Sequence, residues 1–332
     1  MSSSRTTTAK VSFNVGIHIS LEECDKYPDP TPILRTLPPH EIWRDELIGP
    51  SFDFADVAAG LPNLKTAVDI VCPGRLLEEH RCVKVRVDIQ GGLSGGETNL
   101  LVKKIIALVT LLEQHLLIQL TARSREYCLV SRESKIAMKP WPLSNVVSSD
   151  YDAHVPPMAS IKQRSWRNEE LERMYRNFHP IWSAHSLRKL DALLWRPGYG
   201  RACDFFMLPA PEGKSFRDLT SYIPENPNDP KTAWMLKNKE LLCERDPEKR
   251  HTYLYFRYLQ PTPKRTLLRN WVEVIARIVE LALANPDEYK QCLETILTII
   301  YNRDPGERVW EPLMKHVLKL EHRIPEWRDQ IS

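Results

Sequence analysis

Apolar and polar residues alternate along several short segments of the chain, and this two-residue period is typical of β-strands. Other segments are short apolar runs that end at proline. Together these patterns predict strands at 11–23, 66–73, 83–89, 201–209 and 252–260. The segment 83–89 has the most regular alternation, because valine or isoleucine occupies every odd position.

A longer period of 3.6 residues predicts helices. The clearest helix is expected at 98–122, where leucine and isoleucine recur at helical spacing and either Thr98 or Asn99 can cap the start. Further helices are expected at 167–178, 266–283, 286–301 and 308–320. Asn285 followed by Pro286 is a typical helix start, with an N-cap and a proline at the first helical position.

Two proline-rich stretches predict irregular structure. Residues 28–50 are expected to form a loop with a short helix near 39–47, and 139–165 a long flexible loop. Residues 1–10 are polar and are expected to be disordered, whereas 11–332 should form a single domain. Since strands and helices do not alternate regularly, we predict an α+β fold with a curved, largely antiparallel sheet and a helical C-terminal portion.

Composition narrows the class of protein. The chain of 332 residues has a formal net charge of only +3, so we do not expect nucleic-acid binding, which usually needs a clustered basic surface. Seven scattered cysteines suit a reducing compartment. The apolar stretch 100–120 includes Lys103 and Lys104, so we expect a buried helix and no membrane span. A cytoplasmic protein is expected.

Residues two apart on a strand share a face, so three of the predicted strands each present a polar face. The polar positions are Gly16, His18 and Ser20, then Lys84, Arg86 and Asp88, and finally Tyr253, Tyr255 and Arg257. Such a face either meets solvent, as in many antiparallel sheets, or carries a site.

The order of these segments adds a further observation. The motifs are "GIHIS" at 16–20, "VDIVCP" at 68–73, "CVKVRVDIQGG" at 82–92, Glu113 within the long helix, "RSREYC" at 123–128, "YLYFR" at 253–257 and "RNWVEVIARIVELA" at 269–282. This series, which spans about residues 11–285, resembles the fungal-type amidoligase family. That family is a branch of the carboxylate–amine ligases with a glutamine synthetase-like catalytic fold.

The resemblance implies an ATP-dependent ligase that forms amide bonds with magnesium, but most of the family's motif acids and histidines are replaced. The replaced positions are His18 and Ser20 for two glutamates, Lys84 and Arg86 for two histidines, and Tyr255 for a further glutamate. Only an acid, shortened to Asp69, and Arg257 remain.

These replacements weaken a magnesium site. Mg²⁺ takes hard oxygen ligands, mainly carboxylates, in strict octahedral geometry. Like charges about 4 Å apart cost on the order of 4 kcal/mol at an effective dielectric near 20. A face with Lys84, Arg86 and Arg257 should therefore repel a divalent cation.

Three interpretations of these residue replacements stay open. The first is a solvated face with local ion pairs, the second a pocket that holds a carboxylate or phosphate directly, and the third retained catalysis with ATP and Mg²⁺. For an active protein, Asp69 would contact the metal and Arg257 the phosphate or carboxylate. The expected anion-binding residues are Lys84, Arg86, Arg257, Arg125 and His18.

We therefore expect a divergent amidoligase-like protein that has lost its catalytic activity, a pseudoenzyme without a cofactor. The alternative is a non-catalytic anion-binding or regulatory protein that uses the same pocket. Expected partners are a small carboxylate, amine or phosphate, or another protein, and neither nucleic acid nor membrane.

Overall fold

The structure is a computed structural model. It describes residues 11–18, 46–61, 64, 83–90, 95–121, 129–138, 149–161, 168–195, 204–208, 251–259, 265–304 and 306–331, and the statements below concern these residues. The predicted strand at 66–73 and the N-terminal residues 1–10 lie outside them.

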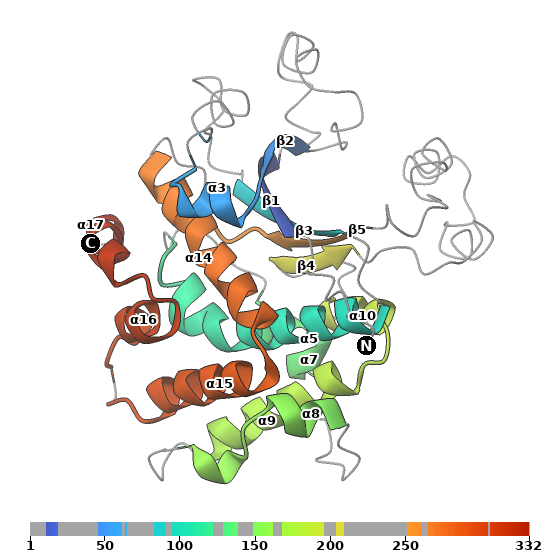
Figure 1. Cartoon of the computed structure of the whole chain (residues 1–332). Helices are drawn as coiled ribbons and strands as arrows, with labels where there is room; N and C mark the ends of the chain where they lie inside the picture. The colour runs from blue at the N-terminus through green and yellow to red at the C-terminus, as the bar shows by residue number, and fades with distance from the viewer. Residues whose placement is uncertain are drawn as a thin grey trace, which may run out of the picture.

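Five antiparallel strands form one sheet in the order β2-β1-β3-β5-β4 (Figure 1). Their bounds are β1 Val11–His18, β2 Glu46–Phe52, β3 Val83–Gln90, β4 Phe205–Leu208 and β5 His251–Phe256. The sheet and its helices confirm the α+β class and the antiparallel sheet. Four of the strands coincide with predicted segments, and β2 falls where the sequence pattern predicts loop and helix.

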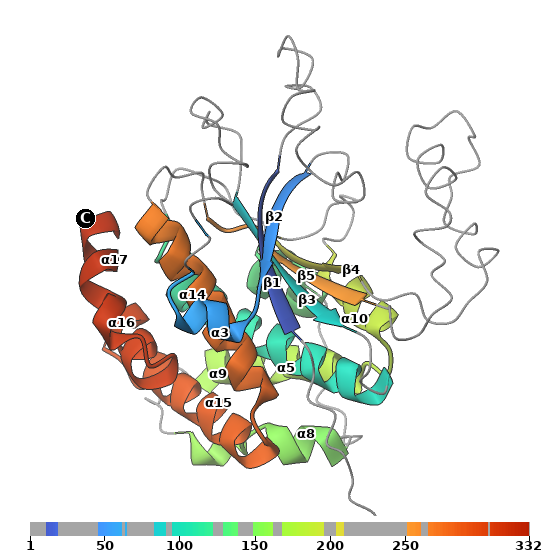
Figure 2. The same ribbon diagram turned by 45° about the horizontal axis from the view of Figure 1, so that its top comes forward.

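Helices lie on one side of this sheet (Figures 1 and 2). They are α3 Phe54–Ala58, α5 Gly95–Leu112, α6 Val130–Glu133, α7 Lys135–Met138, α8 Ser149–His154, α9 Asn168–Ser183, α10 Leu187–Leu194, α14 Arg265–Leu283, α15 Pro286–Tyr301, α16 Trp310–Pro312 and α17 Ile324–Ile331. Two short π-helices, η2 Glu113–Leu117 and η6 Leu313–Val317, and two 3₁₀ turns, η3 Met158–Ser160 and η7 Glu321–Arg323, complete the described elements.

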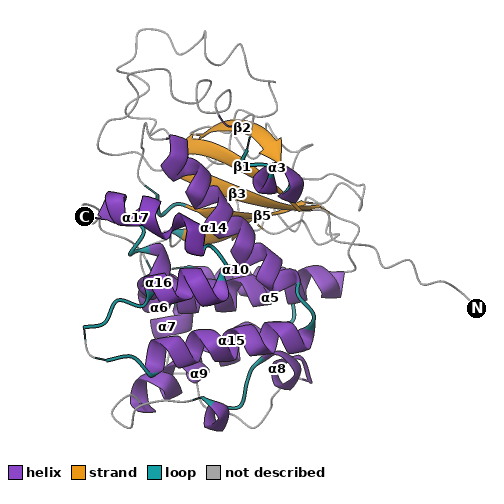
Figure 3. Cartoon of the chain, turned by 60° about the vertical axis from the view of Figure 1, so that its left-hand side comes forward, coloured by secondary structure: helices purple, strands orange, loops and turns teal. Residues whose placement is uncertain are grey.

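The apolar face of the sheet is the one that the alternation predicts. Val85 and Val87 of β3 are fully buried, and they pair across the sheet with Phe256 and Leu254 of β5. Strand β1 continues the same face with Phe13. Helix α14 packs near β1 and α10 near β4, so this face forms the core (Figure 3).

Helix α5 runs through the centre of the helical layer, and two of its lysines are almost completely buried. The ammonium of Lys103 donates to the Trp182 carbonyl, 3.0 Å away, near the C-terminus of α9. Lys104 donates to the Ala284 carbonyl at 2.8 Å, just beyond the C-terminus of α14. A cation is favourable at a helix C-terminus, where carbonyl groups are left without helical partners. These hydrogen bonds therefore explain how two charged side chains can be buried on an otherwise apolar helix.

Helix α5 passes into the π-helix η2 at Glu113, whose side chain is completely buried. The carboxylate accepts hydrogen bonds from the backbone N–H groups of Val130, at 3.0 Å, and Ser131, at 2.7 Å. It also accepts from the Tyr258 hydroxyl at 2.5 Å. Glu113 therefore joins the end of α5 to the start of α6 and to the segment that follows β5.

Several helix predictions are confirmed. Helix α15 has Asn285 as its N-cap and Pro286 at its start, and α14 matches the predicted 266–283 to within one residue. Helix α9 matches the helix expected at 167–178, although it continues to Ser183.

Other predictions are wrong. Helix α5 begins at Gly95, so Asn99 lies inside the helix, where its side chain donates to the Ala184 carbonyl instead of capping. The loop expected at 139–165 contains α8 and η3. Here the imidazole of His154 stacks on Trp182 and donates to the Asp150 carbonyl, which holds α8 in the core.

No helix among the described residues is both long enough and apolar enough to cross a membrane.

Candidate functional site

The strand register brings the predicted polar positions onto one face of the sheet. Arg86 of β3 lies opposite Asn14 of β1 on one side and Tyr255 of β5 on the other. In the neighbouring row, Asp88 lies between Ser12 and Tyr253. The expectation that these strands share a polar face is therefore confirmed for the described positions.

Two aromatic rings stack in the middle of this face. Phe206 of β4 lies directly across from Tyr255, and their rings are nearly parallel, with centroids 4.6 Å apart. The guanidinium carbon of Arg257 lies 4.5 Å from the centroid of Phe206. On the other side of the pair, Arg86 is the cross-strand neighbour of Tyr255 and its guanidinium carbon lies 4.8 Å from the Tyr253 centroid.

This polar face is not freely solvated. Ser12, Asp88 and Tyr255 are buried, and both arginines are half-buried along with the rings that they contact. An interpretation as a plain solvent-facing surface does not fit this burial. Buried polar groups normally have partners, so the donors and acceptors of the two arginines decide what this face can do.

A cation over the face of an aromatic ring is attracted by the ring without a hydrogen bond. The planar N–H donors of arginine match the geometry of a carboxylate or phosphate. The Nε atom of Arg86 is buried and has no hydrogen-bond partner among the described residues. A buried donor left in this state costs about 1–3 kcal/mol, which an anionic ligand would offset.

The other predicted site residues are placed only in part. Asp69 and Arg125 lie outside the described residues. Of Lys84 and His18 the structure describes the backbone, with Lys84 paired to Gly16 and His18 to Glu46. Lys84 is therefore in the row next to Arg86.

The described residues of this face do not fit Mg²⁺. Its described side chains provide two guanidinium groups against the single carboxylate of Asp88. Magnesium requires several oxygen ligands in octahedral geometry, and cations repel it. Within the described part of the chain, no three histidine, cysteine, aspartate or glutamate side chains lie together in a group able to hold a metal ion.

Two further motifs of the series, Glu113 and the Asn-Trp pair, contact other parts of the fold. Burial raises the pKa of Glu113 despite hydrogen bonds from Tyr258, Ser131 and Val130 that act in the opposite direction. Because those bonds connect separate elements, the residue holds the fold together and lies apart from the polar face.

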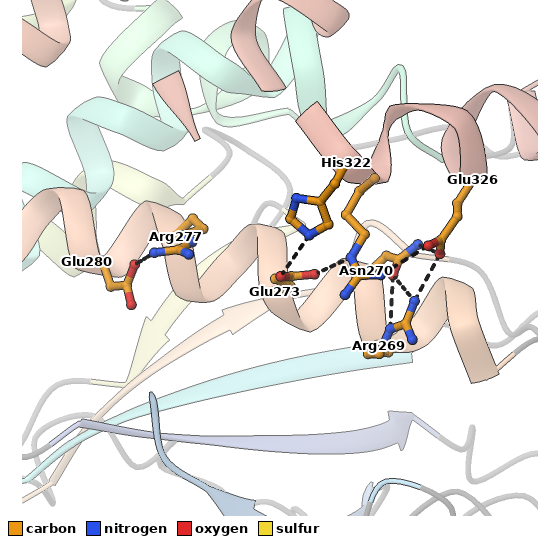
Figure 4. Close-up of polar contacts among 8 residues, drawn as sticks. Arg269, Asn270, Glu273, Arg277, Glu280, His322 and Glu326 are labelled. Atoms are coloured by element: carbon orange, nitrogen blue, oxygen red, sulfur yellow. Dashed lines mark hydrogen bonds and ion pairs between the residues drawn. The ribbon is translucent and has the colours of Figure 1, made fainter. Parts of the chain in front are cut away.

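The Asn-Trp pair of the long C-terminal motif lies on α14. Trp271 is buried in the core, and the side-chain amide of Asn270 donates to Glu326 of α17 at 2.6 Å (Figure 4). Arg269 and Arg323 contact the same carboxylate, at 2.9 Å and 3.0 Å. This network, which we call the C-terminal clamp, attaches α17 to α14.

Phe206 is the residue of the site that the sequence pattern does not identify. The segment 201–209 reads as an apolar strand without a polar face, so none of its residues stands out. Phe206 can be recognised as part of the site only from the pairing of β4 with β5, which brings it opposite Tyr255.

No protein-family model matches the chain, and no curated protein and no solved structure matches it.

Proposed function

We propose that the polar face of the sheet binds a small carboxylate or phosphate anion through Arg86 and Arg257, in a divergent amidoligase-like protein that does not perform the family's magnesium-dependent reaction. Lys84 occupies the next position on this face of β3, and we expect it to add a third cation. The glutamine synthetase-like fold and a cytoplasmic location are parts of this proposal, and they rest on the motif series and on the scattered cysteines.

The placement of two arginines around one aromatic pair carries the proposal. Arg257 is two positions beyond Tyr255, which makes it the diagonal neighbour of Arg86 across β3 and β5. Two like charges on one half-buried face repel each other more strongly than they would in water, because the effective dielectric is lower there. An anion bound between the arginines removes this repulsion.

The loss of ligase activity follows from the same residues. Phosphoryl transfer depends on positioning the metal and neutralising the charge of the triphosphate. The two positions where the family has histidines carry Lys84 and Arg86, whose cationic groups favour an anion over a divalent cation. The ligand then contacts the cations directly.

The test is calorimetry with inorganic phosphate, L-glutamate and ATP as separate probes, each with and without magnesium. We expect at least one anion to bind without magnesium, and Arg86→Gln with Arg257→Gln to weaken that binding at least tenfold, which is about 1.4 kcal/mol. Arg176→Gln is the matched control, because Arg176 lies on the surface of α9 and pairs with Glu172 of the same helix.

A second arm measures phosphate release from ATP with magnesium and a mixture of amino acids and amines. No release is expected. Steady turnover that needs magnesium would refute the loss of catalysis, and the absence of binding by all three probes at millimolar concentration would refute the anion site.

A further inference from the structure

A polar cavity lies outside the sheet, between the π-helix η2 and the turn that follows α15. Its volume is about 270 Å³. One wall comes from η2 and the turn after it, and the other from the turn before α16. The polar residues that line it are Gln114, His115 and Gln119 on the first wall and Arg303, Glu307 and Arg308 on the second.

Both walls adjoin unusual helical geometry. Glu113–Leu117 is a π-helix, and the segment after the second wall leads into the π-helix Leu313–Val317. π-Helices account for well under about 1% of residues and occur often at functional sites. Of the two π-helices among the described residues, η2 contributes Gln114 and His115 to the lining, whereas η6 begins after α16 and does not line the cavity.

Internal hydrogen bonds hold the second wall in shape. Arg303 donates from Nη1 to the Glu307 carbonyl at 3.3 Å, and the Asp304 amide donates to the Glu307 carboxylate at 3.0 Å. The carboxylate of Glu307 is thereby used within the turn. Gly306 has φ = +81°, a conformation that glycine adopts without strain.

The first wall presents amide groups that are also fixed. Gln114 donates to the Ser131 hydroxyl at 2.9 Å and accepts from Arg132 at 3.0 Å. Gln119 donates to the Gln114 carbonyl at 3.3 Å. The wall therefore has little freedom to collapse into the cavity.

We propose that this cavity is a second anion site, which binds a small oxyanion such as phosphate or the phosphate group of a small ester. Arg303 and Arg308 outnumber the single carboxylate of the lining, and arginine suits phosphate through paired N–H donors. The volume falls just below the usual range for drug-sized ligands, about 300–1,000 Å³, so it suits a small polar molecule. This site does not depend on the function proposed for the sheet.

The test uses the full-length variant that has Arg86→Gln and Arg257→Gln, because it lacks the arginines of the sheet face. Calorimetry with inorganic phosphate at low ionic strength should detect binding in this variant. Adding Arg308→Gln should weaken the binding at least tenfold, whereas adding Arg176→Gln should leave it unchanged. Arg308 is exposed and is not part of the hydrogen bonds that shape the turn, so its replacement should not unfold the protein.

Two results would overturn the proposal: no phosphate binding at 20 mM in the variant without the sheet arginines, or binding that Arg308→Gln leaves intact. If the combined variants fail to fold, phosphate is titrated into the wild-type protein instead, and NMR signals of the side-chain amides of Gln114 and Gln119 are followed. Signals that stay in place would equally reject the cavity. Neither failure affects the sheet site, since its test depends on Arg86 and Arg257.

Discussion

Cationic side chains are withdrawn from water both on helix α5 and on the polar face of the sheet, but the groups that contact them differ. On α5, the ammonium groups of Lys103 and Lys104 each donate to a carbonyl at the end of another helix. On the sheet, Arg86 and Arg257 are held by the flat faces of aromatic rings. Each ammonium thus has a carbonyl acceptor, whereas the buried Nε donor of Arg86 has no hydrogen-bond partner among the described residues. Burial of a charge therefore does not indicate function by itself, and the partners of its donors separate structural from ligand-binding cations.

The largest effect is expected from Glu113→Ala, which tests the structural side of this comparison. The substitution leaves the Val130 and Ser131 amides and the Tyr258 hydroxyl without their acceptor. Each unsatisfied buried group costs about 1–3 kcal/mol, so the free energy of unfolding should fall by at least about 3 kcal/mol. Chemical denaturation measures it. A loss below about 1 kcal/mol would show that Glu113 does not hold these elements together.

Lys104→Met leaves the Ala284 carbonyl without its donor, which costs about 1–3 kcal/mol, but it also removes a buried charge, so the full loss in the free energy of unfolding is expected only above about pH 8, where Lys104 is neutral. Lys189→Met, on the exposed surface of α10, serves as the control. Anion binding should be unchanged in both variants. Weaker anion binding in Lys104→Met would break the division between the two regions.

The same lysine predicts a dependence on pH. Burial lowers the pKa of Lys104 to about 8, so the unfolded chain, with its ordinary value near 10.5, keeps its proton to higher pH. Between pH 8 and 10.5 the unfolded state binds more protons, and stability rises with pH. The difference in unfolding free energy between the wild type and Lys104→Met should thus grow by up to about 1.4 kcal/mol per pH unit in this window. A constant difference from pH 7 to 10 would contradict it.

Arg86→Gln with Arg257→Gln should change stability by less than about 1 kcal/mol while weakening anion binding. Removing two cations relieves their repulsion, which offsets the loss of stacking on Tyr253 and Phe206, worth about 0.5–1 kcal/mol per contact. Thermal unfolding without ligand, compared with Arg176→Gln, measures the change. A loss above about 3 kcal/mol would assign these arginines a structural role like that of the lysines.

The smallest effect concerns the C-terminal clamp. Burial alone would raise the pKa of Glu326. The pKa is nevertheless lowered, because Asn270 and Arg323 donate hydrogen bonds to the carboxylate and the charges of Arg323 and Arg269 stabilise its ionised form. Its contribution to stability is present above the ordinary value near 4.5 and is lost as the pH falls through the lower folded value. Glu326→Gln should cost about 1 kcal/mol at pH 7. Hydrogen exchange of residues 324–331 should rise in this variant, and unchanged exchange would exclude the clamp.

The sequence pattern identifies the composition of the sheet face because side-chain direction in a strand depends on a two-residue period alone. The period alone places Lys84, Arg86 and Asp88 on one face of their strand and Tyr253 and Tyr255 on one face of theirs, but it does not show that the two strands are neighbours. The pairing of β4 with β5 depends on distant residues, so Phe206 could not be identified.

Tertiary contacts also explain the errors in the helices. The bonds from Val130 and Ser131 to Glu113 connect residues 17 and 18 positions apart, and no local pattern reports them. The segment 149–154 has a polar composition that favours a loop, but the hydrogen bond from Lys290 to the Asp152 carbonyl and the packing of His154 stabilise a helix. The sequence likewise does not show which group accepts a hydrogen bond from each buried cation, because these partners are distant along the chain.

The most direct test of the central claim is a double-mutant cycle on anion binding. The wild type, Arg86→Gln, Arg257→Gln and the double variant are titrated by calorimetry with the probe that binds the wild type most tightly. If both arginines contact one ligand, each single substitution weakens binding about tenfold or more, and the double loss is smaller than the sum by about 0.5–3 kcal/mol. Equal affinities in all four proteins would contradict the account.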